Sequence, residues 1–278
     1  MRVSTAQMYQ VPADAVGSGS AAMAREIGRI ASGRGIDAVS QDVAAVSQSS
    51  RLTQVKARTE VHAGNLSELD MRYAEADLSL SAIGDALLRM GEALARSRNG
   101  ALASDAQNAL STGLRLDAAA IQAELTRRDS QARPIFSQGV ADADHPALEV
   151  RPGQTMSSEV TLEGSAETTL AGLIGQDWVL DLASSTDAQR GQAAQQIEAL
   201  RAAVLDARGS VGTRWSLVAT YQDANQGVAD AAVAARSSLV DTDLAQAASS
   251  LATYSAQLQA ARSMFGRIES TSLFDLIR

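Results

Sequence analysis

The sequence predicts a mainly α fold: a long antiparallel helical coiled-coil bundle formed by the N- and C-terminal arms, with a small central β element. The chain of 278 residues is 45% hydrophobic but only 3% aromatic, which favours narrow helical seams over one large core. Two regions repeat apolar residues at alternating spacings of three and four. Pro12, Pro134, Pro146 and Pro152 are the four prolines, and they leave two long stretches of the chain free of proline.

The first of these stretches carries an unbroken heptad pattern. Its apolar positions are Leu66, Leu69, Tyr73, Ala76, Leu80, Ile83, Leu87, Met90 and Leu94, and the same frame continues back to Leu52. This spacing keeps one apolar seam on a slightly underwound helix. We therefore expect a helix from about residue 41 to Ser97, ended by Asn99-Gly100. A second helix is expected from Ser104, as its cap, to about Asp129.

The last stretch repeats the pattern at Val240, Leu244, Ala247, Leu251, Tyr254, Leu258, Ala261, Phe265 and Ile268. Before it, we expect a helix from Thr186 that ends at Gly209, then another that begins near Val211 and is interrupted near Asp241. Asp241 and Asp243 are expected to cap the terminal helix. The glycine pairs in residues 17–19 and 33–35 indicate flexible or helix-ending segments, because neither fits a phosphate-binding loop.

The centre of the chain has a different pattern. Residues 147–155, ALEVRPGQT, indicate a strand, a Pro-Gly turn and a second strand, and residues 159–164 alternate as a strand does. We expect a β element from about Arg133 to Gly164, inserted between the helical arms. Trp178 and Trp215 are expected to pack where the helices meet it.

Composition and motifs disfavour several classes of function. The 24 basic and 32 acidic residues give a net charge of −8, which is unsuited to nucleic acid. No stretch approaches the ~18 apolar residues of a membrane span, and the N-terminal residues lack the apolar core of a secretory signal. With no cysteine and two histidines, a thiol nucleophile and a Cys- or His-rich metal site are excluded. No nucleophile is flanked by a base and no phosphate-binding loop is present, so we expect no catalytic, cofactor-binding or metal site. His62 lies on the heptad seam, and His145 is expected in a solvated turn.

The heptads themselves leave two structural roles open. They can pair within one chain as an ordinary bundle, or between chains as the seam of a polymer. Periodicity is the same in both cases, so it does not choose between them.

Motifs at both ends and in the centre resemble the flagellin superfamily, and within it the hook–filament junction proteins. MRVSTAQMYQ (residues 1–10) is similar to their start, and residues 249–277 are similar to the family's terminal helix with its LQA…F…I…SLF pattern. Collinear matches between them are IASGR (30–34), RPIF (133–136, with Pro134 in place of Tyr), LEVRPGQT (148–155) and VLDARGSVG (204–212). The chain has Gln41-Asp42-Val43 where the family commonly has Asp-Asp-Pro.

The resemblance implies a structural subunit and not an enzyme. It implies that the N- and C-terminal helices pair into an inner coiled coil that stacks between subunits, after export of the unfolded chain by the flagellar type III apparatus. The implied location is the extracellular flagellum. The implied partners are identical subunits in a ring, a neighbouring hook-associated protein, flagellin, and an export chaperone on the C-terminal helix.

On this basis the chain divides into residues 1–40 (assembly segment), 41–132 (rod helices), 133–185 (outer β-containing element), 186–240 (rod helices) and 241–278 (assembly helix). The expected assembly interface consists of Val3, Met8, Met23, Ile27, Ile30, Leu244, Leu251, Tyr254, Leu258, Phe265, Ile268, Leu273 and Phe274. A filament flagellin and a non-flagellar coiled-coil adaptor remain the alternative interpretations.

Overall fold

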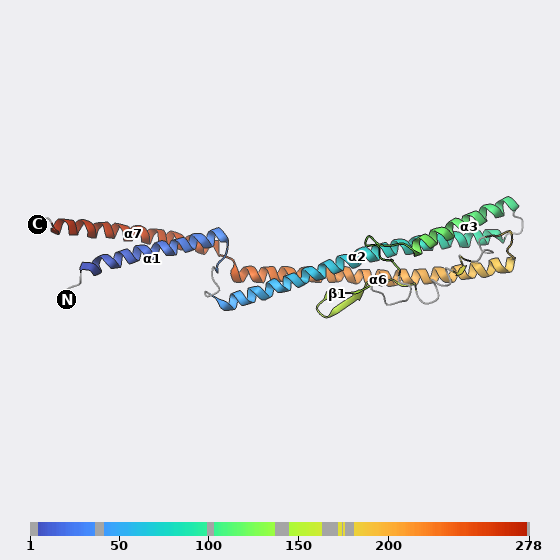
Figure 1. The fold of residues 1–278 in the computed structure, drawn as a ribbon, viewed down its shortest axis with the longest axis horizontal. Coiled ribbons are helices and arrows are strands. Elements are labelled where there is room, and N and C mark those ends of the chain that lie inside the picture. The colour runs from blue at the N-terminus through green and yellow to red at the C-terminus, as the bar shows by residue number, and fades with distance from the viewer. Residues whose placement is uncertain are drawn as a thin grey trace. The chain divides into compact units, whose positions relative to one another are not determined.

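The computed structural model is mainly helical, as the sequence predicts, with one small antiparallel sheet (Figure 1). It describes residues 5–36, 42–98, 103–136, 145–162, 172–173, 175 and 181–276; for residues 5–9, 11–12 and 268–276 the backbone alone is described. The long helices are α1 (Thr5–Ser32), α2 (Val43–Ser97), α3 (Ser104–Leu125), α6 (Asp187–Val240) and α7 (Leu244–Leu276). The chain divides into two compact units, one of Met1–Ala57 with Ala229–Arg278 and one of Arg58–Val228.

The core of the second unit is the apolar seam of α2. All nine heptad residues from Leu66 to Leu94 have exposed fractions of 0%, so the predicted seam is confirmed. They pack with Leu114 and Ile121 of α3 and with Ile197 and Val204 of α6 in one hydrophobic cluster. Helices α3 and α6 therefore cover the seam of α2, and α3 lies along α2 in Figure 1.

Polar contacts between the helices fix their directions. Along α2, Asp70 accepts a hydrogen bond from Trp215 of α6 at 2.6 Å, and Asp77 accepts one from Arg208 at 2.7 Å. Arg98, directly after the end of α2, donates to Asp187 at the start of α6 at 3.3 Å. Residues later in α2 thus meet residues earlier in α6, so the two helices run antiparallel.

Helix α6 is one continuous helix of 54 residues from Asp187 to Val240, so the expected break at Gly209 is wrong. A glycine inside a helix costs only about 0.5–1 kcal/mol relative to alanine. Ala207 and Val211, on either side of Gly209, are buried in the core, and their burial outweighs that cost. The helix begins with a reciprocal cap, in which Thr186 and Gln189 bond each other's backbone N–H groups.

Helix α3 differs from its prediction at both ends. Its N-cap residue is Ala103 and makes no side-chain capping bond, so Ser104 is the first helical residue and not the cap. The helix ends at Leu125, four residues before the expected end at Asp129. Asp129 instead accepts hydrogen bonds from the backbone N–H groups of Gln131 and Arg133, at 2.9 Å each, and so holds a tight turn that a longer helix would remove.

The predicted hairpin is confirmed: β1 (Ala147–Arg151) pairs antiparallel with β2 (Gln154–Ser157). Gly153 has a φ of 73°, a conformation that glycine adopts without strain and that the turn requires. Residues 158–162 form no strand; Val160 makes one isolated parallel bridge with Phe136. The expected strand over residues 159–164 is therefore wrong for residues 159–162. Residues 163–164 lie outside the described part of the chain, as do Asn99-Gly100 and Trp178.

The first unit contains a helix pair formed by α1 and α7, which lie side by side (Figure 1). Helix α1 runs through Pro12 and residues 17–19 without a break, so the expectation of a flexible or helix-ending segment there is wrong. Gly33 follows the end of α1 with a φ of 68° and is helix-ending as expected. Asp243 caps α7 by accepting from the N–H groups of Ala245 and Gln246, which confirms half of the predicted capping pair.

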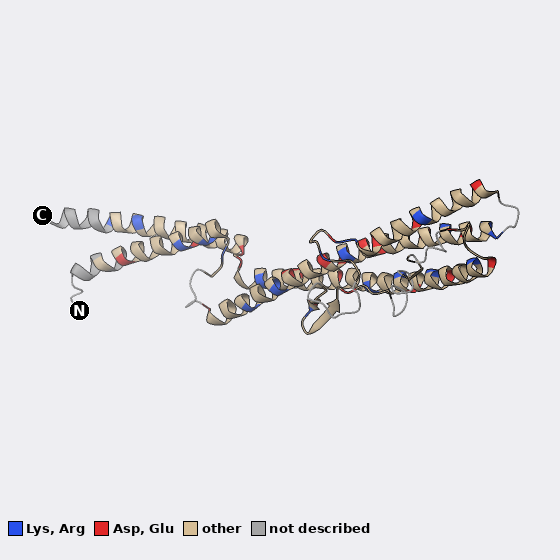
Figure 2. Cartoon of the chain, turned by 45° about the vertical axis from the view of Figure 1, so that its right-hand side comes forward, with Lys and Arg blue, Asp and Glu red and all other residues tan. Residues whose placement is uncertain are grey.

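Charged residues of both signs are interspersed along the helices (Figure 2). In the described part of the chain, no helix is both long enough and apolar enough to span a membrane.

Burial on the α2 seam predicts a sharp difference between two neighbouring leucines. Leu80 is fully buried and Leu78 is 61% exposed. We expect Leu80→Ala to lower the free energy of unfolding by about 2–5 kcal/mol and Leu78→Ala to change it by less than about 0.5 kcal/mol. Guanidinium unfolding of the full chain followed by circular dichroism measures both; equal losses would contradict this packing.

Candidate assembly interface

Helices α1 and α7 approach each other closely along the pair. A Cβ placed on Gly19 of α1 would lie 3.6 Å from Cδ1 of Leu258 in α7, an ordinary van der Waals distance, so this position of α1 faces α7. Where the pair closes, Thr242 donates from its backbone N–H to the Gly33 carbonyl at 3.0 Å. Its hydroxyl donates to the Arg29 carbonyl at 3.3 Å. These bonds tie the end of α1 to the start of α7.

The structure brings several of the predicted interface residues into this pair, at different depths. Leu258 is buried; Met23, Ile30, Leu251, Tyr254 and Phe265 are half-buried. Ile27 and Leu244 are exposed, at 48% and 59%. Val3 lies outside the described residues, and Met8, Ile268, Leu273 and Phe274 lie on helical backbone whose side chains are not described. Whether these thirteen residues form contacts between subunits stays a prediction.

The incomplete burial has a simple geometric cause. A pair of helices covers only one side of each seam, whereas the seam of α2 is enclosed by three elements. One result is an apolar groove of about 510 Å³ lined by Ala13 and Val16 of α1 and by Arg262, Phe265 and Gly266 of α7. The pair therefore retains apolar surface that a further helix could cover.

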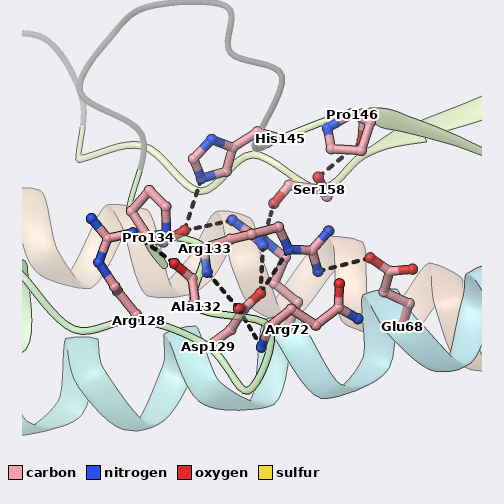
Figure 3. A network of polar contacts seen from close by, with 11 residues as sticks. Glu68, Arg72, Arg128, Asp129, Ala132, Arg133, Pro134, His145, Pro146 and Ser158 are labelled. Atoms are coloured by element: carbon pink, nitrogen blue, oxygen red, sulfur yellow. Dashed lines mark hydrogen bonds and ion pairs between the residues drawn. The ribbon is translucent and has the colours of Figure 1, made fainter.

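The second unit contains a buried polar network centred on Arg72 of α2 (Figure 3). Its guanidinium donates to the Ser158 carbonyl at 2.7 Å, to the Pro134 carbonyl at 2.7 Å and to the Asp129 carboxylate at 3.0 Å. Arg133 lies beside it and pairs with Asp129 at 3.0 Å and with Glu68 at 2.8 Å. The network joins α2, the turn after α3 and the end of the hairpin.

Electrostatics in this network follow from burial and from these partners. Burial, and next the neighbouring Arg133, lower the pKa of Arg72 below its ordinary value. Burial would raise the pKa of Asp129, but hydrogen bonds from the backbone N–H groups of Arg133 and Gln131 and from the Arg133 side chain outweigh it. The pKa of Asp129 is therefore lowered. The carboxylate stays ionised and compensates the buried cation.

Other side chains tether the hairpin to the two long helices through its backbone carbonyls. On α2, Asn65 donates to Glu149 and Tyr73 donates to Ser157; on α6, Asn225 donates to Val150 and Arg214 donates to Glu159. Burial raises the pKa of Tyr73, which keeps its hydroxyl protonated as a donor. A two-stranded hairpin is marginal alone, so these bonds decide where it sits.

Both histidines are buried. For His62 this agrees with its seam position, and its Nε2 lies 3.9 Å from Oε1 of Glu149. For His145 the expected solvated turn is wrong, because its Nε2 lies 3.0 Å from the Pro134 carbonyl oxygen that also accepts from Arg72. Residues 141–144, directly before His145, lie outside the described part of the chain. The contact of His145 with the Pro134 carbonyl therefore marks this end of the network.

Sequence reasoning did not find the role of Arg72, although the sequence contains a signal for it. Arg72 follows Leu69 by three positions and precedes Ala76 by four, so helical periodicity places it on the buried face. A charged residue at such a position needs buried partners. Which carbonyls supply them depends on the hairpin, whose location the periodicity does not give.

No arrangement for catalysis is visible in the part of the chain that the structure describes. No group of three or more metal-binding side chains gathers among those residues. The buried ionic groups around Arg72 are occupied with one another and with backbone carbonyls, which is a structural arrangement. What the described geometry offers is an extended helical surface with one apolar pair of helices.

Comparisons with known proteins place the fold. No family model matches the chain, and no curated protein matches it. Among solved structures, the chain is similar to a candidate flagellar hook-associated protein from Vibrio parahaemolyticus, at 16% sequence identity and a TM-score of 0.63. The match covers 72% of this chain and all of that chain. At this identity the likeness concerns the fold alone.

The pKa of Asp129 gives a pH-dependent prediction. Because this pKa is lower in the folded chain, its stabilisation is complete above the unfolded value of about 3.9 and is lost as the pH falls through the folded value. We expect Asp129→Asn to lower the free energy of unfolding by about 3 kcal/mol at neutral pH and by progressively less in acid. Urea unfolding across this pH range measures the difference.

The matched control is Asp117→Asn, because Asp117 pairs with Arg89, whose side chain is 56% exposed. We expect a loss below about 1 kcal/mol for this partly exposed pair, in which the Asp117 side chain is 16% exposed. Equal losses for the two variants, or a loss at Asp129 that does not change with pH, would contradict the buried network.

Proposed function

We propose that the chain is a structural subunit of the bacterial flagellum, and specifically a hook–filament junction protein that self-assembles through its helical ends. The observation that carries this proposal is the α1–α7 pair, which brings the two terminal helices together and leaves their apolar seam only partly covered. Assembly would bury that seam, with a gain of about 25 cal/mol for each Å² of apolar surface removed from water.

Two independent lines support the flagellar assignment. The terminal and central motifs resemble the flagellin superfamily in the order expected along the chain. The fold is similar to that of a protein described as a candidate hook-associated protein, and the chain spans the whole of it. The sequence motifs and the fold therefore point in the same direction, although they are different kinds of observation.

The proposal assigns a role to each part of the chain. Residues 1–40 and 241–278 would form the inner assembly layer, residues 41–132 and 186–240 the rod, and residues 133–185 the small outer element. The Arg72 network would hold that outer element to the rod. The subunit would act as a mechanical connector, without catalytic activity or a cofactor.

The proposal also assigns a route and partners. The chain would be exported unfolded by the flagellar type III apparatus without a cleaved signal and would reside outside the cell. Its partners would be identical subunits in a ring, a neighbouring hook-associated protein and flagellin, with an export chaperone bound to the C-terminal helix before assembly. Neither nucleic acid nor membrane insertion has a part in it.

Removal of residues 249–278 tests the role of the terminal helix. We expect the truncated chain to be exported or retained but never to assemble on hooks, because α1 then lacks its partner seam. Electron microscopy of hooks and a motility assay measure this. Normal filaments from the truncated chain would refute the assignment.

A milder test compares Leu258→Asp with Gln257→Asp, because Leu258 is buried and its neighbour Gln257 is exposed. Only Leu258→Asp should block assembly.

Immunogold labelling of intact flagella separates the proposal from its alternatives. We expect label confined to the boundary between hook and filament. Label along the whole filament would identify a flagellin instead. Protein that stays inside the cell, with no label on flagella, would identify a coiled-coil adaptor.

A further inference from the structure

The first unit carries two polar cavities of opposite charge near the junctions of its helices. The basic cavity, of about 270 Å³, is lined by Arg34 and Arg236 together with Ile36, Val46, Ser49, Ser50, Thr53 and Val240. The acidic cavity, of about 290 Å³, is lined by Glu26, Asp241 and Asp243 together with Arg29, Gly35, Thr242, Gln246, Ala247 and Ser250. The proposed function so far uses neither cavity.

The basic cavity presents cations without an opposing charge. Arg34 and Arg236 are exposed, and neither guanidinium forms an ion pair with the acidic residues that the structure describes. Among the described residues, no acidic side chain lines this cavity. Two of its hydroxyl groups donate to backbone carbonyls within α2, Ser50 to Val46 and Thr53 to Ser49. A guanidinium pair beside hydroxyl groups is suited to receive carboxylates, which a planar guanidinium binds in bidentate fashion.

The acidic cavity presents the complementary groups. Glu26 is paired with Arg29 at 3.2 Å, so its charge is compensated within the chain. Asp241 accepts from the Ser237 hydroxyl, and Asp243 accepts from the first N–H groups of α7. Both aspartates are exposed, and neither pairs with a described basic side chain. Two carboxylates therefore remain available for a cation from outside the chain.

Backbone bonds hold the two cavities next to each other. The N–H of Gly35 donates to the Val240 carbonyl at 2.7 Å, and Arg34 and Asp241 form an antiparallel bridge. A Cβ on Gly35 would lie only 3.1 Å from the Asp241 carbonyl oxygen, so glycine permits this close approach. Although their backbones pair, Arg34 lines the basic cavity and Asp241 lines the acidic one, and their side chains form no ion pair.

We propose that these cavities form a head-to-tail contact, in which Arg34 and Arg236 of one subunit receive Asp241 and Asp243 of a second copy of the chain. The proposal rests on the proposed function, since it names the polar contact of a self-assembling subunit. Where such a contact repeats in one direction, it generates rings or filaments. The charges disfavour a docking that brings the arginine patches of two copies together, or their aspartate patches.

A second copy explains more of the geometry than a free anion does. A small anion would account for the two arginines but not for the aspartates that the same backbone junction displays. The chain carries a net charge of −8, so repulsion between copies is general and local complementary sites are needed to bring them together. Because the groups are exposed, the contact should weaken as salt is added.

A charge-swap experiment on the full chain tests the contact. The first variant is Arg34→Glu with Arg236→Glu, and the second is Asp241→Arg; Asp243 is left in place because it caps α7. Sedimentation velocity over a range of protein and salt concentrations measures self-association. We expect each variant alone to associate about tenfold more weakly than the wild type. An equimolar mixture should recover association, because each variant then meets an opposite charge on the other.

The control is Arg51→Glu with Arg115→Glu, which makes the same change in net charge at exposed positions outside both cavities. It should associate as the wild type does, and circular dichroism should show that every variant is folded. If the wild type associates and both charge-swap variants associate equally well, the proposed contact is wrong but self-assembly stands. The contact is also wrong if the variants lose association and the equimolar mixture does not recover it. A wild-type chain that does not associate at any concentration would overturn the self-assembly on which the contact rests.

Discussion

The structure depends first on the burial of one continuous apolar seam on α2. Nine residues at alternating spacings of three and four are removed from water completely, and each needs atoms from another element to do so. Helices α3 and α6 provide them, and the hairpin and its flanking loops add Ile135, Phe136 and Val150 to the same cluster. Low aromatic content is compatible with this core because the helices pack along a line, where leucine and alanine fit between backbones.

Next to this apolar seam, one buried cation organises the non-helical part of the second unit. Arg72 has more hydrogen-bond donors than its single carboxylate partner can accept, and burial makes every unused donor costly. Two backbone carbonyls from segments far apart in the chain complete its set, and this requirement locates both the turn after α3 and the end of the hairpin. A hairpin too small to be stable alone is thereby held at a defined place on α2 and α6.

Much of the helical layout could be predicted from the sequence because it follows from local periodicity. The seam of α2, the Pro-Gly hairpin and the cap at Asp243 all depend on neighbours close in the chain. The continuity of α6 through Gly209 could not be predicted, since it depends on the burial of Ala207 and Val211 against distant residues. The burial of His145 and the partners of Arg72 depend on where the hairpin docks, which also requires long-range contacts.

The two units carry the same kind of heptad but reach different degrees of burial, and this contrast bears on function. The pattern in α7 is as regular as that in α2, yet Leu244 remains exposed while every seam residue from Leu66 to Leu94 is buried. The difference lies in the number of covering elements, because α7 has α1 beside it where α2 has two helices and a hairpin. A regular seam that its own chain covers only in part is what a subunit needs if its remaining partners are to come from neighbouring copies. Arg34, Arg236, Asp241 and Asp243, which form no ion pair among the described residues, lie in this same unit, so it carries both an apolar groove and exposed charges.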